Sequence, residues 1–407
     1  MGYIKRSMED VFLRLNEEYP AVLLTGPRQV GKTTMLQNLI AVEARNRNYV
    51  SLDDLNERIL AKSDPAMFFQ LHQPPVLIDE IQYAPELFTY IKIHVDKYQR
   101  AGDVWMTGSQ LFMDGVQESL AGRVALLHLS PLSQQEIYGH PFGAFCLDMT
   151  ALSERQRVVE PVSVSDVFQR LFLGGMPALV SKKYQERNIF YASYISTYLE
   201  RDVKALSGGI DSLKFLNFIT AVAARTAQMV NYKGIADDCD IDQTTAKRWL
   251  RVLETLGIIF YLHPYSNNVL KRMVKTPKLY FYDTGLSCYL TKWSSAETVM
   301  SGAMNGALLE NYVVSEIQKS YQNTGQEAYL YYYRDKDARE IDLIMEGDGQ
   351  LHPLEIKKTA APEKKMIRTF SAIEKAPLQR GTGAMLCLAE KLGAFDRENL
   401  IVPISLI

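Results

Sequence analysis

The sequence predicts an α/β protein with more than one domain, and three separate patterns support this prediction. Near the start, an apolar run leads into a glycine-rich loop and then into apolar residues at helical spacing. In the middle, a short and a longer helical pattern precede two strand-like runs. Near the end, two strand-like runs flank a Glu-Gly-Asp-Gly turn. A chain of 407 residues is long enough for two or three domains.

The glycine-rich loop has the pattern G-x-x-x-x-G-K-T, whose backbone N–H groups close around phosphate oxygens. The apolar run 21–25 before it is typical of a buried parallel strand, and a helix after it would set its N-terminus against the phosphates. Lys32 supplies charge to the outer phosphates, and the Thr33 hydroxyl is a ligand for Mg²⁺. We therefore expect ATP to bind at Gly26, Pro27, Arg28, Gln29, Val30, Gly31, Lys32, Thr33 and Thr34.

A second apolar run, 76–80, ends in two acids, as expected of the strand that holds Mg²⁺ beside such a loop. Asp79 would hold the metal, directly or through water. Glu80 would act as the general base that activates the attacking water. The adjacent Glu80 favours hydrolysis over nucleotide storage.

A third apolar run, 104–106, leads into polar residues that can contact the γ-phosphate. Ser109 is the expected sensor of that phosphate, with Thr107 and Gln110 as alternatives. Further on, Arg123 is a candidate arginine finger that reaches a neighbouring subunit's γ-phosphate. An ordinary surface ion pair is an equal alternative for Arg123.

Residues 231–265 follow the pattern of a winged helix-turn-helix. The longer helix has an apolar face at 3.6-residue spacing and a basic face. From residue 243 to 278 there are seven Lys or Arg, Lys278 among them, against one acid, Glu254. A local excess of this kind indicates duplex DNA binding, and protein contact is the alternative. The predicted DNA-binding residues are Thr244, Lys247, Arg248, Arg251, Lys271 and Arg272.

The late hairpin places acids and a lysine together. In the run 353–358 the strand period of two puts Glu355 and Lys357 on one face. A hairpin turn at 346–349 can bring Asp342 beside Glu355, so that two carboxylates bind Mg²⁺ while Lys357 orients or activates water. This arrangement resembles the PD-(D/E)xK site of restriction-endonuclease-like nucleases. The resemblance implies one further acid on a preceding helix, which matches Glu310, with Glu316 as a weaker candidate.

The order of these motifs resembles one family across nearly the whole chain. The runs GPRQVGKTT, SDPAMFF, VLIDEIQ, LAGR, PLSQQEI, GGMPALV, YLERDV, PKLYFYDTGL, REIDLI and PLEIKK are similar to those of AAA+ ATPases of the AAA_14/DUF4143 type. The resemblance implies a P-loop AAA+ core, a helical lid that responds to nucleotide, and a homo-oligomeric, hexameric ring. We therefore expect an ATPase core over 1–135, a helical lid over 136–210, a winged helix over 211–290 and a restriction-endonuclease-like domain over 291–407.

Composition narrows the class of protein further. The net charge of −2 gives no global attraction to nucleic acid, so DNA binding must come from a local patch. The four cysteines and six histidines are scattered, which argues against a disulfide framework and a zinc site. No apolar run approaches the length of a membrane span, and the N-terminus lacks a signal pattern, so we expect a cytoplasmic protein without membrane contact.

Together these patterns predict an ATP-dependent enzyme that binds and remodels, or cleaves, duplex or branched DNA. Two alternatives remain open at this point. The chain could be a slow nucleotide switch in signalling or defence, with the winged helix used for protein contacts. It could also be a DNA junction motor whose nuclease-like domain does not cut, since a fold does not fix a function.

Overall fold

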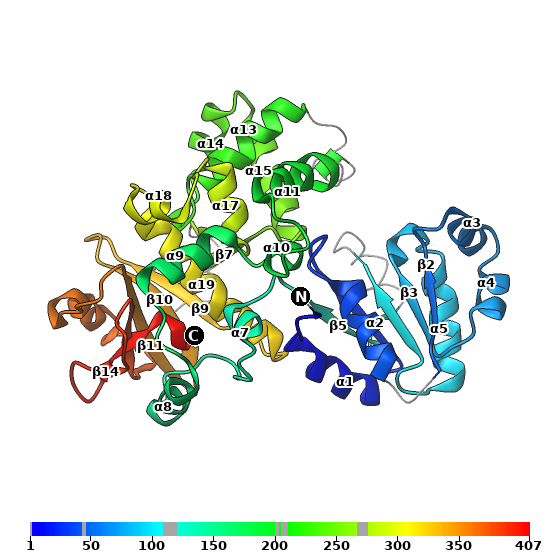
Figure 1. Ribbon diagram of the computed structural model, residues 1–407, viewed down its shortest axis with the longest axis horizontal. Helices are drawn as coiled ribbons and strands as arrows, with labels where there is room; N and C mark the ends of the chain where they lie inside the picture. Colours follow the sequence, from blue (N-terminus) through cyan, green and yellow to red (C-terminus); the bar gives the residue numbers. More distant parts are fainter. Residues whose placement is uncertain (1, 43–45, 109–119, 200–202, 205–210, 267–275) are drawn as a thin grey trace.

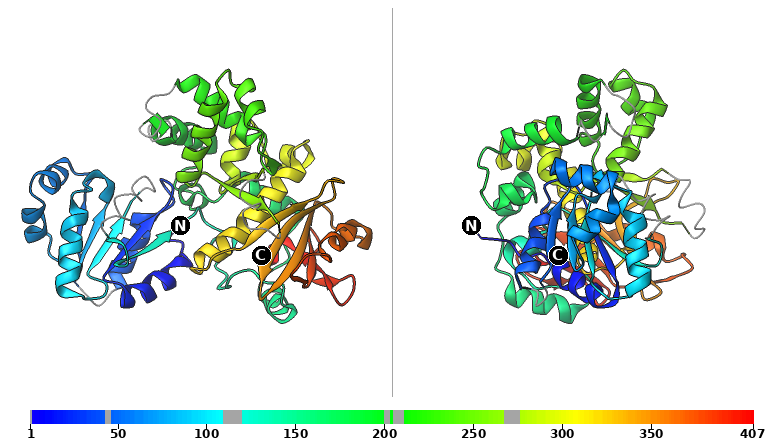
Figure 2. Two further views of the ribbon diagram at one scale, coloured as in Figure 1. Left: turned by 180° about the vertical axis from the view of Figure 1, so that it is seen from behind. Right: turned by 90° about the vertical axis from the view of Figure 1, so that its right-hand side faces the viewer.

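The computed structural model describes residues 2–42, 46–108, 120–199, 203–204, 211–266 and 276–407. Two sheets lie at opposite ends of the longest axis, and a helical region rises between them (Figures 1 and 2). The α/β prediction is confirmed by a five-stranded parallel sheet and a second, mixed sheet. No helix in the described part of the chain is long and apolar enough to cross a membrane.

The N-terminal sheet has the strand order β2-β3-β4-β1-β5, with every pair parallel. Its central strands are buried on both faces, which explains their continuous apolar runs. Helices α1 and α2 cover one face, and α3, α4 and α5 supply the core on the other. The elements are α1 (Met8–Glu18), β1 (Ala21–Thr25), α2 (Lys32–Val42), β2 (Asn48–Ser51), α3 (Leu55–Ser63), α4 (Pro65–Leu71), β3 (Val76–Asp79), η1 (Ile81–Tyr83), α5 (Leu87–Tyr98), β4 (Val104–Thr107) and β5 (Val124–His128).

Residues 136–210 were expected to form one lid, but their apolar side chains pack in two separate hydrophobic cores. Side chains of α8 and α9, such as Leu152 and Phe168, pack with the C-terminal domain. Those of α10, α11 and η3, such as Leu179 and Tyr194, pack with the N-terminal sheet and with the helical region of residues 212–255. The elements are α7 (Gln134–Tyr138), α8 (Met149–Val158), α9 (Val164–Leu173), α10 (Pro177–Val180), α11 (Arg187–Tyr194) and the π-helix η3 (Ile195–Leu199).

The next region has the helix–turn–helix and wing order that the sequence predicts. Asn231 caps α14 and Asp242 caps α15, so each helix begins at a side chain that accepts its first N–H groups. Strands β7 and β8 form the antiparallel wing, and β6 pairs with β8. The elements are α13 (Ser212–Ala223), β6 (Gln228–Met229), α14 (Tyr232–Asp238), α15 (Gln243–Thr255), β7 (Ile259–Pro264) and β8 (Lys278–Phe281).

The wing continues into the C-terminal sheet, because β7 pairs in parallel with β9. The combined sheet has the order β14-β15-β13-β11-β10-β9-β7-β8-β6, with β12 beside β11. Strands β10 and β11 form the predicted hairpin, and Asp348 and Gly349 at its turn both have positive φ, as a two-residue turn requires. The elements are α17 (Thr284–Leu290), α18 (Ala296–Ser301), α19 (Asn305–Asn323), β9 (Leu330–Arg334), β10 (Glu340–Gly347), β11 (Gln350–Lys357), η4 (Lys364–Ile373), β12 (Gln379–Arg380), β13 (Gly383–Cys387), β14 (Gly393–Ala394), β15 (Asn399–Pro403) and η5 (Ile404–Leu406).

Candidate functional site

The phosphate loop joins β1 to α2 and depends on its first glycine. Gly26 has φ +142°, and a Cβ there would lie 2.2 Å from the carbonyl oxygen of Leu129. Only glycine therefore allows the loop to start so close to the end of β5. Lys32 is buried, and its ammonium donates to the carbonyls of Gly26 (2.9 Å) and Pro27 (2.8 Å). Its charge thus sits inside the loop where the outer phosphates are expected.

Thr33, Asp79, Glu80 and Thr107 meet at the carboxyl edge of the parallel sheet. The Thr33 hydroxyl donates to Asp79 Oδ1 over 2.8 Å. The Thr107 hydroxyl also donates to Asp79 and accepts the backbone N–H of Glu80 at 3.0 Å. A hydroxyl and a carboxylate side by side are oxygen ligands of the kind Mg²⁺ prefers. The arrangement also puts Thr107, the alternative to Ser109, in contact with both acids; Ser109 and Gln110 lie outside the described residues.

Two further side chains reach these acids, and sequence reasoning missed both. Tyr49 on β2 donates its hydroxyl to Asp79 Oδ2 (3.2 Å), and burial together with the Asp79 charge raises the pKa of Tyr49. Gln82 donates its amide to the Glu80 carboxylate. The only sequence signal for Gln82 was its place two residues after Glu80. Glu80 itself has φ 58°, a left-handed conformation that turns the chain out of β3.

The predicted arginines have different surroundings. Arg123 forms a two-point ion pair with Asp96 on α5, with N···O distances of 2.5 and 3.1 Å. This pair must open before Arg123 can reach another subunit. Arg28 lies 5.8 Å from the ring centre of Tyr198 on η3, so the loop contacts the π-helix. The finger assignment of Arg123 stays a prediction.

The predicted DNA-binding face lies on α15. Thr244, Lys247, Arg248 and Arg251 are all exposed there, while Lys271 and Arg272 lie outside the described residues. The segment that follows this helix packs against the phosphate loop. A Cβ at Gly257, two residues after the end of α15, would lie 3.0 Å from Pro27 Cγ and 3.1 Å from His128 Cε1. Burial and the nearby Lys32 charge lower the pKa of His128 to about 4, so its imidazole is neutral at physiological pH.

Lys278, counted above with the basic residues of 243–278, is not part of an exposed basic patch. It is 3% exposed at the start of β8, and its ammonium contacts Glu310 (3.0 Å) and Glu340 (2.6 Å). Tyr280 from the same strand donates to Glu310 over 2.7 Å. Burial alone would lower the pKa of Lys278, but the surrounding carboxylates outweigh it and the pKa is raised. The wing therefore supplies two side chains to the C-terminal acids.

The hairpin brings together the other predicted residues of the C-terminal site. Lys357 Nζ lies 2.6 Å from Glu355 Oε1 and 3.3 Å from Asp342 Oδ2. Asp342 also accepts the backbone N–H of Ile356 (2.9 Å). It lies where the register between β9 and β10 shifts, between Ile341 and Ile344, and such irregularities re-aim side chains.

The buried acids of this site lie close enough together to raise the pKa values of two of them. Burial and the neighbouring Asp342 carboxylate raise the pKa of Glu310 to about 7 and that of Glu355 to about 8. Glu355 is 6% exposed, and its Oε2 has no hydrogen-bond partner. An orphaned carboxylate oxygen in such a cluster fits a divalent cation. Among the described residues, however, no three His, Cys, Asp or Glu side chains are grouped so that they could hold one metal ion together.

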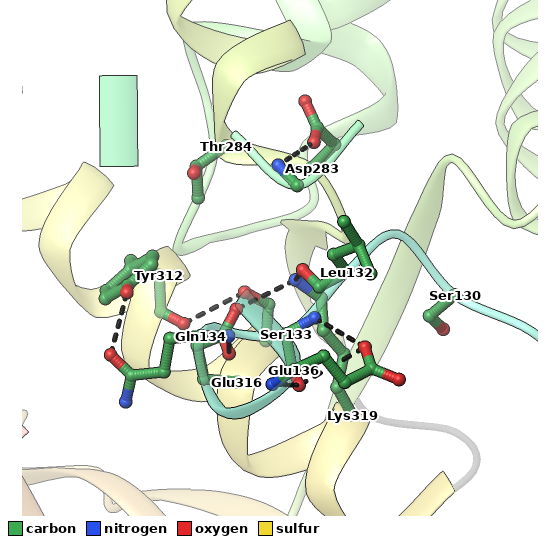
Figure 3. A network of polar contacts seen from close by, with 12 residues as sticks. Ser130, Leu132, Ser133, Gln134, Glu136, Asp283, Thr284, Tyr312, Glu316 and Lys319 are labelled. Carbon is green, nitrogen blue, oxygen red and sulfur yellow. Dashed lines mark hydrogen bonds and ion pairs between the residues drawn. The ribbon is translucent and has the colours of Figure 1, made fainter. Parts of the chain in front are cut away.

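Glu316, the weaker candidate for the helix acid, serves a different contact. It is buried, accepts the backbone N–H of Gln134 (2.7 Å) and pairs with Lys319 (2.8 Å), as Figure 3 shows. Glu310 and Glu316 are six residues apart on α19 and therefore lie on different faces of the helix. Of the two, only Glu310 faces the hairpin acids.

A divalent cation is expected to stabilise the protein more at pH 8.5 than at pH 6. Because the folded pKa values of Glu310 and Glu355 lie above their ordinary value of 4.5, the folded state holds protons that the unfolded chain releases. Stability from these groups is thus lost as pH rises from about 4.5 to 8, and a cation bound to the ionised acids restores it. At a hundred times its Kd, the cation would add about 3 kcal/mol.

Thermal unfolding in Mn²⁺ without nucleotide measures this effect. Glu355→Gln should remove the difference between the two pH values. Glu363→Gln, on the exposed surface of the same domain, should keep it. Equal stabilisation of wild type at both pH values would contradict the assignment of a cation to these acids.

Three family models match consecutive parts of the chain. The model described as "AAA domain" matches residues 18–138, and two domains of unknown function match the rest: DUF8612 at 164–297 and DUF4143 at 305–407. The resemblance to the AAA_14/DUF4143 type is confirmed by these matches. The middle match spans the expected boundary between lid and winged helix.

Relatives and solved structures that resemble this chain were also found. An uncharacterised protein of Mycobacterium tuberculosis is 29% identical over 347 residues, 84% of this chain and 71% of the relative. One from Methanocaldococcus jannaschii is 22% identical, covering 73% of this chain and 67% of the relative. Among solved structures, a Walker-type ATPase of Pyrococcus abyssi matches 71% of this chain and 96% of its own at 15% identity and a TM-score of 0.44. The RuvB Holliday junction branch migration motor of Thermotoga maritima matches 63% and 89% at 16% identity and a TM-score of 0.31.

Proposed function

Because this chain joins an AAA domain to a C-terminal DUF4143 domain, we propose that it is an ATPase that uses ATP to bind and remodel DNA. One observation carries the link between the two activities. The exposed face of helix α15 holds Lys247, Arg248 and Arg251, and Gly257, two residues after the end of this helix, packs against Pro27 of the phosphate loop. A change in the loop on ATP binding or hydrolysis therefore acts directly on the helix that would contact DNA.

The residues of the ATP site have separate roles in this proposal. Lys32 and the loop N–H groups would bind the phosphates, while Thr33 and Asp79 would hold Mg²⁺, which neutralises charge on them. Glu80 would take a proton from the attacking water, and Thr107 ties the position of Glu80 to that of Asp79. Arg123 would act on a neighbouring subunit in a homo-oligomeric ring, for which a hexamer is our proposal.

The C-terminal domain would act on the DNA that α15 holds. Asp342 and Glu355 would hold a second Mg²⁺, which activates water and stabilises charge on a phosphate. Lys357, in contact with both acids, would orient that water. Cleavage is the activity this set of side chains supports, and recognition of a branched structure without cutting is the alternative.

A second function, the slow nucleotide switch, is favoured by the contact between Gln82 and Glu80. This hydrogen bond must break before Glu80 can accept a proton from water. In that case turnover would be slow and would ignore DNA.

ATP turnover measured without DNA and with single-stranded, duplex and branched DNA tests the proposal. We expect duplex or branched DNA to raise the rate severalfold. Replacing Lys247, Arg248 and Arg251 together by Ala should remove this stimulation and lower the salt slope of DNA binding by about two to three. A matched triple replacement of the exposed Lys62, Lys97 and Lys375 by Ala removes the same charge elsewhere and should change neither.

Two results would redirect the proposal. An unchanged salt slope in the α15 variant would move the DNA contact to another surface. Turnover that ignores every DNA would support the switch. The same samples, run on labelled DNA with Mg²⁺ or Mn²⁺ beside Glu355→Ala, separate a nuclease from a motor, because only a nuclease loses product in that variant.

A further inference from the structure

Arg6 lies just before α1 and is almost completely buried, with 2% of its surface exposed. Its guanidinium donates to three groups from separate parts of the chain: the carbonyl of Val30 (2.8 Å), the carbonyl of Ser130 (2.7 Å) and Glu136 Oε1 (2.9 Å). A planar group with five fixed donors suits three acceptors at set angles, whereas a lysine offers a single point charge. The arrangement therefore holds three segments in one geometry.

The bond to Val30 acts on the phosphate loop itself. A peptide unit is planar, so the carbonyl of Val30 and the N–H of Gly31 point in opposite directions. Fixing one fixes the other. Gly31 has φ 94°, and because glycine adopts positive and negative φ about equally well, other orientations of this peptide are open to the loop. Arg6 selects one in which the N–H of Gly31 points away from Arg6.

Glu136, the acidic partner of Arg6, is fully occupied by donors. Its Oε1 also accepts the N–H of Ser7, and its Oε2 accepts the N–H of Ser133, both at 2.9 Å. Glu136 thereby caps α7 and clamps the N-terminal segment to it. Any displacement of Arg6 is passed to α7 through this carboxylate.

The start of α7 is in turn bonded to α19 of the C-terminal domain (Figure 3). Besides the bond from the Gln134 N–H to Glu316, the Tyr312 hydroxyl donates to Gln134 Oε1 at 2.9 Å. Ser130, whose carbonyl Arg6 holds, donates its hydroxyl to Gln322 on the same helix (2.8 Å). Glu316 lies only about 9 Å along α19 from Glu310 of the carboxylate site.

We propose that Arg6 is a positioning residue of the phosphate loop, and that its pair with Glu136 transmits nucleotide binding to α19. Hydrogen bonds lead from Val30 through Arg6 and Glu136 to Ser133, and the next residue along the backbone, Gln134, donates to Glu316. The inference rests on the proposed ATP site and adds a route by which that site acts on the C-terminal acids.

Nucleotide affinity and hydrogen exchange test the two parts of the proposal. Arg6→Gln should raise the Kd for ADP about tenfold, because the loop then populates other peptide orientations. Arg6→Lys should recover part of the loss. In wild type, ADP should change the exchange of residues 130–138 and 305–323 as well as of the loop. In Arg6→Gln and Glu136→Gln, at saturating ADP, only the loop should respond.

Control variants distinguish a loss of folding from a loss of the coupling between the phosphate loop and α19. Lys5→Gln removes a neighbouring charge whose pair with Asp10 is exposed, and it should behave as wild type. Tyr312→Phe deletes one hydroxyl from the α7–α19 contact and should weaken the response of α19 while leaving the Kd for ADP unchanged. If the Arg6 variants do not fold, Tyr312→Phe still tests the coupling.

Two outcomes would overturn the inference alone. One is a wild-type α19 whose exchange ADP does not change, and the other is an equal change in Arg6→Gln. No DNA is present, so failure of the DNA proposal leaves this test intact. Absence of any loop response in wild type would overturn the nucleotide site and the inference together.

Discussion

Lys32→Ala is expected to lose ATP binding and to lower ATP turnover by about a hundredfold or more. The Lys32 ammonium is enclosed by the loop, where it contacts two loop carbonyls, and its loss would remove the charge that this position supplies to the phosphates. Nucleotide affinity measured by equilibrium binding, with turnover beside it, checks this expectation. Lys62→Ala, an exposed lysine of the same domain, should match wild type in both.

A Lys32→Ala variant that hydrolyses ATP normally would remove the phosphate-loop assignment and everything built on it. A variant that binds ATP normally but does not turn it over would give Lys32 a role in the reaction rather than in binding. The unfolding temperature should stay near that of wild type, since the loss concerns the ligand and not the core.

Lys278→Met is expected to lower the free energy of unfolding by about 3–5 kcal/mol at pH 8. The substitution keeps the apolar stem of the side chain but leaves Glu310 and Glu340 without their buried cation. Breaking a buried pair by removing one partner is costly because the other charge stays in a poorly solvated place. The loss should be smaller at pH 6, below the pKa of about 7 of Glu310, where this acid is already largely protonated.

Urea unfolding of the two proteins at both pH values measures the difference. Lys364→Met, which removes a lysine from the exposed pair with Asp396, should cost less than about 1 kcal/mol. Adding Glu310→Gln and Glu340→Gln to Lys278→Met should recover most of the stability. Equal stability of Lys278→Met and wild type would show that the acids do not need this cation.

The sequence predicted helices, strands and turns correctly where a few consecutive residues determine the local backbone conformation. The strand, glycine loop and helix at 21–42 needs only its own residues, and so does the hairpin around Asp348 and Gly349. The pairing of Asp342 with Glu355 and Lys357 followed from strand period and turn length. These predictions depend on backbone geometry that neighbouring residues determine.

The remaining contacts depend on partners far along the chain. A count of charges cannot distinguish the buried Lys278 from an exposed wing lysine, because its acids come from α19 and β10. Arg6 belongs to no motif, and its acceptors lie 24 to 130 residues away. The packing of α8 and α9 with the C-terminal domain was equally invisible, since an amphipathic helix does not specify which core receives its apolar face.

Because β7 pairs with β9, the C-terminal domain cannot be cut out or exchanged between proteins without breaking a sheet. A fragment that begins at residue 291 would leave β9 as an uncovered edge of the sheet, and such an edge can pair with another chain. It would also carry Glu310 and Glu340 without Lys278. An exchange of the C-terminal domain between relatives should therefore carry residues 228–281 with it, so the wing and the acids are expected to be inherited as one piece.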